Sequence, residues 1–189
     1  MKRVFIGVKI IAGPVLLKTI NSLKTVLAGE KIKWVDPENI HLTLAFIGET
    51  EEERIKILSI MLKQACTGFG EFSFRLCSTG VFKNLRDPRV LWIGIEGYEK
   101  LSELNDLVKT GLNDTGFPVE DRPFKPHVTL GRIKHLKNAE SLKSALEMYR
   151  DTFIQDVIVE ELILYQSVLR PEGPIYKAIE TFSLNQGRS

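Results

Sequence analysis

The sequence has little cysteine and little net charge, and each scarcity excludes a class of protein. Its 189 residues include two cysteines, Cys66 and Cys77, which form no Cys-x-x-Cys pair. A disulfide framework or a zinc site is therefore not expected, and we predict a cytoplasmic protein that needs no metal. A net charge of +2 is too small to indicate nucleic-acid binding by itself, so any basic surface must be local.

Long apolar runs are also absent. No run approaches the roughly 18 residues of a membrane span, and residues 1–8 lack the apolar core and cleavage site of a signal peptide. We therefore expect no membrane partner. The chain lacks a glycine-rich phosphate loop followed by Lys-Ser or Lys-Thr, so ATP-driven chemistry is not expected and no cofactor is predicted.

Histidine is scarce, yet two of the three histidines open the same short motif. Residues 41–44 read HLTL and residues 127–130 read HVTL, and each motif lies in an apolar run bounded by breakers, which predicts a strand. Alternate side chains of a strand share a face. Each motif should therefore present its histidine and threonine together over a buried apolar backing. Two half-buried histidines without a function are the alternative.

The order of the predicted elements repeats along the chain. Residues 5–8 (FIGV) match residues 92–95 (WIGI) at an offset of 87, and the two motifs lie 86 residues apart, which predicts an internal duplication. In the first half we expect a helix after the motif strand, capped by Thr50 with Glu53 in a capping box.

The fold class that this order predicts is α+β. We expect a single bilobal domain over residues 1–189, built from duplicated β-α-β-α-β units with lobes at about 1–83 and 88–170. A C-terminal strand at 174–184 would pack back onto them. Two antiparallel sheets would face each other across a central cleft with the helices outside, and this would bring His41 and His127 together.

Two imidazoles with ordinary pKa values near 6.5 can act as one acid and one base at neutral pH. Such a pair suits a reaction with an attack on one side and a leaving oxygen on the other. Phosphodiester cleavage fits, because the hydroxyls of Thr43 and Thr129 can bond the non-bridging oxygens while the histidines move protons.

The chain as a whole resembles the 2H phosphoesterases, which are named for two HxTx motifs. Within that family it is similar to the bacterial and archaeal RNA 2′,3′-cyclic phosphodiesterase branch, also called 2′–5′ RNA ligase. The resemblance is carried by residues 5–6 (FI), 34–35 (WV), 37–44 (PENIHLTL), 46–49 (FIGE), 88–92 (PRVLW), 123–130 (PFKPHVTL), Arg132, 167–169 (SVL) and 173–176 (GPIY). Ala45 and Gly131 depart from the family pattern, at positions that are not catalytic.

The resemblance implies a metal-independent hydrolysis of an RNA 2′,3′-cyclic phosphate to a 2′-phosphate. His41 would be the proton donor to the departing 3′ oxygen, and His127 would be the proton acceptor from the attacking water. Thr43, Thr129 and Arg132 would bind the phosphate. The expected partner is RNA with a 2′,3′-cyclic phosphate end, including tRNA fragments, and the expected state is a monomer. Any 2′–5′ ligation would be the reverse of ring opening.

Several individual residues keep two interpretations. Arg132 lies five residues after His127, so pleat alternation places it on the opposite face unless the strand bulges near Gly131. Phe46 has the parity of the core residues Leu42 and Leu44, so it either packs in the core or stacks on a base. Further candidates for base or RNA contact are Phe124, Lys125 and Tyr176.

Charged residues outside the motifs are expected mainly at the surface, His135 among them. A set of basic residues near the motifs could guide an RNA end by phosphate contacts: Lys31, Lys33, Arg86, Arg89, Arg122, Lys125, Arg132 and Lys134. Two other functions stay open. One is a non-catalytic RNA-binding module, and the other is a 2H phosphodiesterase that acts on linear 2′–5′ oligonucleotides.

Overall fold

A computed structural model describes residues 1–119, 122–170 and 173–185 of the chain. Helices and strands alternate along it, so the predicted α+β class is confirmed. The helices are α1 (Pro14–Val26), α2 (Glu52–Cys66), α3 (Glu99–Asp114) and α4 (Ala139–Glu147), with a short 3₁₀ turn at Pro37–Asn39. The strands are β1 (Lys2–Lys9), β2 (Lys31–Trp34), β3 (His41–Thr50), β4 (Phe72–Phe82), β5 (Val90–Glu96), β6 (His127–His135), β7 (Phe153–Val159), β8 (Glu161–Val168) and β9 (Ile175–Ser183).

The strands form one antiparallel sheet that is narrow in its middle. Its order is β7-β4-β5-β6-β3-β1-β8-β9, with β2 paired to β6. The two motif strands, β3 and β6, meet there through a single ladder pair, Leu42 with Val128. We call β3-β1-β8-β9 the first arm and β6-β5-β4-β7 with β2 the second arm. The two sheets expected from the sequence are thus two arms of one sheet.

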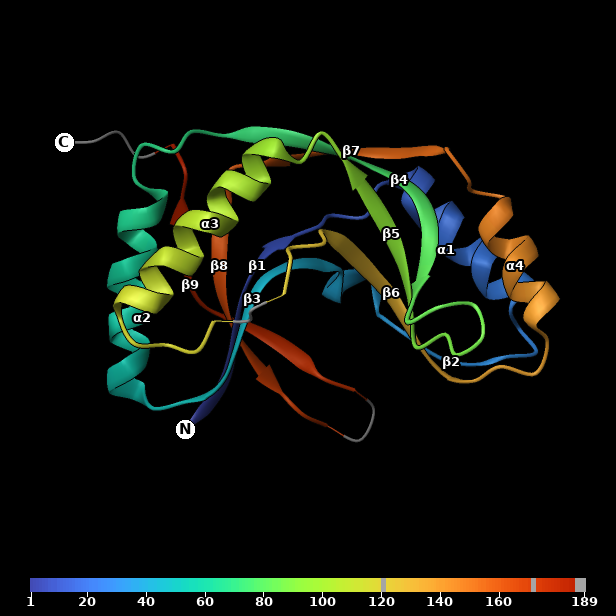
Figure 1. The fold of residues 1–189 in the computed structure, drawn as a ribbon, viewed down its shortest axis with the longest axis horizontal. Coiled ribbons are helices and arrows are strands. Elements are labelled where there is room, and N and C mark those ends of the chain that lie inside the picture. The colour runs from blue at the N-terminus through green and yellow to red at the C-terminus, as the bar shows by residue number, and fades with distance from the viewer. Residues whose placement is uncertain (120–121, 171–172, 186–189) are drawn as a thin grey trace.

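Each arm is covered by two helices on its outer side. Helices α2 and α3 pack together on the first arm, while α1 and α4 pack on the second (Figure 1). Each arm therefore draws elements from both halves of the sequence, and the arms do not coincide with the expected lobes at 1–83 and 88–170. The reason is that α1 and β4 of the first half lie in the second arm, while α3 and β8 of the second half lie in the first arm.

The strand order reads the same from both ends if β1 is equated with β5, β3 with β6, β4 with β8 and β7 with β9. This symmetry supports the predicted duplication, which itself stays a prediction. Its consequence for the site is simple. The two motif strands lie next to each other at the centre, one contributed by each arm.

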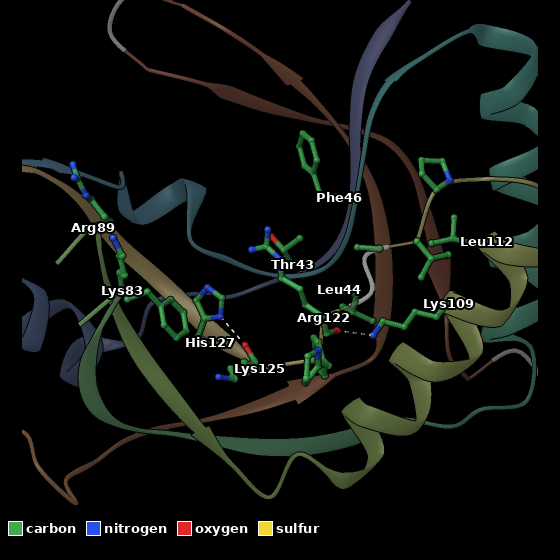
Figure 2. A pocket seen from close by; sticks show the side chains of 16 residues that line it. Thr43, Leu44, Phe46, Lys83, Arg89, Lys109, Leu112, Arg122, Lys125 and His127 are labelled. Carbon is green, nitrogen blue, oxygen red and sulfur yellow. Dashed lines mark hydrogen bonds between the residues drawn. The ribbon is translucent and has the colours of Figure 1, made fainter. Parts of the chain in front are cut away.

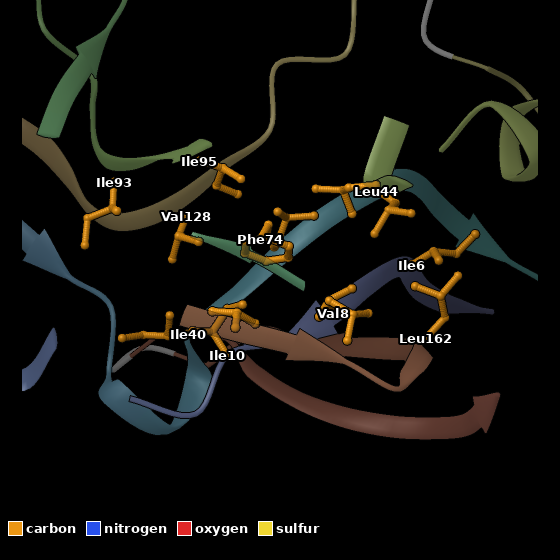
Figure 3. Packing of buried hydrophobic residues seen from close by; sticks show 14 of the residues in the cluster. Ile6, Val8, Ile10, Ile40, Leu44, Phe74, Ile93, Ile95, Val128 and Leu162 are labelled. Carbon is orange, nitrogen blue, oxygen red and sulfur yellow. The ribbon is translucent and has the colours of Figure 1, made fainter. Parts of the chain in front are cut away.

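The core continues from one arm into the other beneath the motif strands. Leu42 and Val128 are both fully buried, and they belong to one cluster with residues of β1 and β5 such as Ile6 and Ile93 (Figure 3). Burying an apolar side chain of this size contributes about 1.5–3 kcal/mol. The backing that the motifs were predicted to have is therefore shared between the arms, and it fixes the two strands against each other.

The predicted capping box at the start of α2 is wrong. Thr50 is still part of β3, where it pairs with Lys2, and its hydroxyl donates to the carbonyl of Gly48. Helix α2 begins two residues later, and its N-cap residue, Glu51, makes no side-chain capping bond. The strand pairing extends further than the apolar pattern indicated. Among the described residues, no helix is long and apolar enough to cross a membrane.

Candidate active site

The two motif histidines are held in the same way. The Nδ1 atom of His41 lies 2.7 Å from the carbonyl oxygen of Asn39, and Nδ1 of His127 lies 2.7 Å from that of Lys125. A carbonyl can only accept, so each Nδ1 carries the hydrogen and donates it. This leaves Nε2 of each neutral imidazole with a lone pair that can take a proton. When the ring is charged, the same atom can give one.

The antiparallel pairing of Leu42 with Val128 sets how the four motif side chains face one another. Thr43 follows Leu42 on the side where His127 precedes Val128, and His41 lies on the side of Thr129. Leu42 and Val128 turn into the core, whereas the four polar residues lie on the other face. The arrangement brings two imidazoles and two hydroxyls to one place at the junction of the arms.

The pKa of His41 lies below its ordinary value of 6.5. Burial of the ring is the largest cause, because it disfavours the charged form. The Asn39 carbonyl opposes this shift, while the positive charges of Arg132 and His127 add to it. His41 is therefore mainly neutral at about pH 7 in the free protein. The same charge effects show that Arg132 and His127 lie close enough to His41 to act on it.

Arg132 reaches the motif face through a bulge. On β6, Thr129 pairs with Trp92 and Gly131 with Leu91, so Leu130 between them has no partner on β5. The alternation of buried and exposed residues shifts by one position at the bulge, because Leu130 and Gly131 are both buried. Arg132 is therefore exposed, on the same face as His127 and Thr129. This is the bend that the sequence required. Gly131 allows β2 to approach β6 closely, because a Cβ at this position would lie 2.8 Å from Cγ2 of Ile32 and would push β2 away.

Phe46 is brought to the same face by a matching bulge. On β3, Thr43 pairs with Gly7 and Ala45 with Ile6, which leaves Leu44 without a partner on β1. Phe46 is consequently 42% exposed instead of lying in the core. The guanidinium of Arg3 sits 4.9 Å from the centre of its ring. Of the two interpretations of Phe46, core packing is excluded.

A cavity of about 650 Å³ opens beside His127 and Thr43 (Figure 2). Three of the candidate RNA contacts, Phe46, Phe124 and Lys125, line it. Its remaining walls carry further cations and apolar side chains: Leu44, Ala45, Phe82, Lys83, Arg89, Lys109, Leu112, Pro118, Val119, Arg122 and Pro123. Such a mixture of aromatic rings and cations is typical of surfaces that hold single-stranded nucleic acid.

A smaller cavity of about 280 Å³ lies beside His41. The fourth candidate contact, Tyr176, lines it, and its ring meets the ring of His41 edge-on at 4.8 Å. Phe5 packs against His41 at 5.0 Å between ring centres. The rings therefore limit how the imidazole can turn.

Sequence reasoning missed Phe5 and Phe82 as neighbours of the two histidines. Phe82 meets His127 edge-on at 4.8 Å, and no motif marks it. Phe5 belongs to one of the two matched tetrapeptides, so the repeat could have pointed to it. His135 is exposed at the end of β6, as expected. Within residues 1–119, 122–170 and 173–185, no group of three His, Cys, Asp or Glu side chains could hold a metal ion.

Comparison with known proteins gives consistent results. The sequence model of a family described as LigT like Phosphoesterase matches residues 12–92 and again residues 93–176. An RNA 2′,3′-cyclic phosphodiesterase of Thermotoga maritima is 37% identical over 147 residues, which cover 77% of this chain and 76% of the relative. A protein of the same name from Aeropyrum pernix is also 37% identical and covers 85% of this chain and 91% of its own.

Solved structures share the whole fold. A protein of Thermus thermophilus superimposes with a TM-score of 0.78 at 28% identity, covering 99% of this chain and 100% of its own. LigT of E. coli, complexed with 3′-AMP, superimposes with a TM-score of 0.72 at 24% identity, covering 98% of this chain and 99% of its own. The second likeness concerns the fold alone.

Proposed function

Since this chain belongs to the LigT-like phosphoesterase family and is a phosphoesterase, we propose that it hydrolyses the 2′,3′-cyclic phosphate at the end of an RNA strand to a 2′-phosphate. The name of its relatives supports this substrate. The observation that carries the proposal is the matched anchoring of His41 and His127. Each ring donates through Nδ1 to a carbonyl two residues upstream, so both Nε2 atoms are available for proton transfer.

The proposed reaction is an in-line displacement at phosphorus. His127 takes a proton from the attacking water, and His41 gives one to the departing 3′ oxygen, so the diester keeps its bond to the 2′ oxygen. The hydroxyls of Thr43 and Thr129 donate to the non-bridging oxygens. Arg132 adds positive charge where the transition state gathers negative charge. General acid and base groups of this kind each contribute about 10²–10⁴-fold.

The lowered pKa of His41 bears directly on its part as the acid. In the free protein Arg132 and His127 disfavour a charged His41. A bound phosphodiester carries a negative charge, which opposes both effects and raises the pKa of His41 again. The substrate thus supplies part of the condition under which His41 is protonated.

The two cavities offer places for the rest of the RNA. The larger one provides Phe46 and Phe124 as stacking surfaces and Lys125 as a phosphate contact, with Lys109 and Arg122 nearby. The smaller one provides Tyr176 beside His41. We expect base contacts to tolerate different sequences, because stacking uses the face that every base has. Action on tRNA fragments, a monomeric state and a cytoplasmic location remain predictions.

We propose that no metal ion takes part. The two histidines, the two hydroxyls and Arg132 supply the proton transfers and the charge that the reaction requires, so each step has a named side chain. Ligation through a 2′–5′ bond would be the same ring opening with a ribose 5′-hydroxyl as the attacking group in place of water: the 3′ oxygen leaves and takes a proton, and the phosphate joins the 2′ oxygen to the 5′ oxygen. It would need neither ATP nor a phosphate loop.

The test is hydrolysis of a short RNA that ends in a 2′,3′-cyclic phosphate, with the product identified by phosphorus NMR. The wild type, His41→Ala and His127→Ala are compared in excess EDTA. We expect a 2′-phosphate product, insensitivity to EDTA and a loss of at least about 10²-fold in each variant. His135→Ala is the matched control, because this histidine is exposed and lies outside the motifs.

Other results would redirect the proposal. A 3′-phosphate product would show that the 2′ oxygen is the leaving group and that the 3′ oxygen stays bonded to phosphorus. Inhibition by EDTA would show that a metal is required. Turnover of linear 2′–5′ oligonucleotides, without turnover of the cyclic end, would move the activity to that alternative substrate.

A further inference from the structure

The two motif strands share a structural device that lies just behind the site. Besides a second register shift at Ile47 of β3, each strand contains an extra residue three positions after its histidine. This residue is Leu44 on β3, which lacks a partner on β1, and Leu130 on β6, which lacks a partner on β5. A bulge of this type leaves the extra residue outside the ladder. Its backbone carbonyl must find a donor elsewhere, because an unpaired buried carbonyl is costly.

The two carbonyls are satisfied by different means. The carbonyl of Leu130 accepts from the backbone N–H of Val35 at 2.8 Å. The carbonyl of Leu44 accepts from Nδ2 of Asn105, a side chain of α3, at 3.0 Å. The second bond therefore depends on one side chain that a point substitution can remove.

Asn105 is unusual for a residue on the inner face of a helix. It is fully buried, and its Oδ1 atom has no partner among the described residues. Burying an amide with unsatisfied bonding capacity costs stability. Its apolar neighbours on the same helix, Leu101, Leu104 and Val108, show what the core otherwise uses there. An apolar residue would serve the stability of the core at this position at least as well. The presence of an asparagine is explained by its hydrogen bond to the Leu44 carbonyl.

We infer that Asn105 is a positioning residue of the active site, which holds the bulge at Leu44 and thereby sets Thr43 and Phe46. Thr43 directly precedes the bulge, and Phe46 lies two residues beyond it. Phe46 points to the site face only because the bulge changes the parity of β3, whereas Thr43 shares the face of His41 and is held there by the backbone that leads into the bulge. Without the bond from Asn105, the strand can satisfy the Leu44 carbonyl only by moving, and the motif moves with it.

The inference rests on the proposed function for its assay. Asn105→Ala is compared with the wild type in hydrolysis of the RNA 2′,3′-cyclic phosphate. We expect kcat/KM to fall by roughly 10- to 100-fold, since small misplacements of reacting groups have effects of this order. Val108→Ala is the matched control, because Val108 is fully buried on the same helix and lines neither cavity. This control should keep wild-type kcat/KM below its unfolding transition.

A double-substitution cycle separates positioning from general damage. If Asn105 sets Phe46, then Phe46→Ala should cost little more in the Asn105→Ala background. In the Val108→Ala background, Phe46→Ala should lower kcat/KM by the same factor as in the wild type. Independent effects of Asn105→Ala and Phe46→Ala would overturn the inference. So would equal losses in Asn105→Ala and Val108→Ala.

Asn105→Asp provides a second route and serves if the alanine variant does not fold. A carboxylate cannot donate to the Leu44 carbonyl, whereas a protonated carboxyl group can. The activity of this variant relative to the wild type should therefore recover as the pH is lowered. A ratio that is constant with pH would argue against a donor role for residue 105.

Failure of the proposed function would be seen separately, as absence of turnover by the wild type. The same variants would then be compared by NMR. Asn105→Ala should shift the amide signals of Thr43 and Phe46, and Val108→Ala should leave them in place. Unmoved signals in Asn105→Ala would reject the positioning role whatever the substrate is.

Discussion

Gly7→Ala should lower the activity of the site by displacing the motif strand β3, which pairs with β1. Gly7 lies on β1, opposite the first motif, and a Cβ added there would stand 2.6 Å from the carbonyl oxygen of Leu42. An ordinary contact begins at 3.4 Å, so β3 must retreat by about 0.8 Å, the difference between the two. The atom in the way belongs to the backbone between His41 and Thr43. No side-chain rotation can relieve the clash.

Two measurable effects follow from this displacement. Overpacking of a core typically costs about 1–3 kcal/mol of unfolding free energy. A displacement near 1 Å at reacting groups costs on the order of 10²-fold in rate. We therefore expect Gly7→Ala to unfold at a lower temperature and, while still folded, to lose about that factor in kcat/KM for the cyclic phosphate. Thermal unfolding and steady-state hydrolysis measure the two effects.

Gly29→Ala is the matched control for this substitution. A Cβ at Gly29 meets nothing within 4 Å, so both stability and kcat/KM should stay close to the wild type. The decisive case is a folded Gly7→Ala protein. If it turns over within about twofold of the wild type, the position of the motif strand against β1 does not matter for catalysis, and the reasoning is refuted.

Three further predictions concern charge and protonation. Arg132→Gln should lower kcat/KM and should also shift its alkaline limb to higher pH, because Arg132 is one of the causes that lower the pKa of His41; a pH–rate profile with an unmoved limb would contradict this. The lowered pKa of His41 means that the unfolded chain binds more protons there than the folded one, so this contribution to stability is present above about pH 6.5 and is lost as the pH falls through the folded pKa. Urea unfolding across this range should show a smaller loss for His41→Asn than for the wild type, and equal losses would speak against it. Burial raises the pKa of Cys66 to about 12 and that of Cys77 to about 11, so neither should react with iodoacetamide at about pH 8 until the protein unfolds; rapid labelling of the folded protein would refute this.

Local patterns in the sequence were sufficient for the strands that carry the motifs and for the helices that cover them. The alternation of apolar and polar residues predicted that Leu42 and Val128 are buried beneath the histidines, and both are. The same alternation could not decide Arg132 or Phe46. A bulge depends on how one strand registers with its neighbour, and that register is a property of two distant segments.

The sequence by itself determined which residues the proposed chemistry of this protein uses. Two histidines and two threonines at matched spacing, on strands with an apolar backing, already indicate a paired acid and base around a phosphate. Only the tertiary structure decided what surrounds them. It exchanged helices between the two halves of the chain, turned Arg132 and Phe46 to the site, and buried Asn105 against the Leu44 carbonyl. These features arise from contacts between segments far apart in the chain, which no local periodicity records.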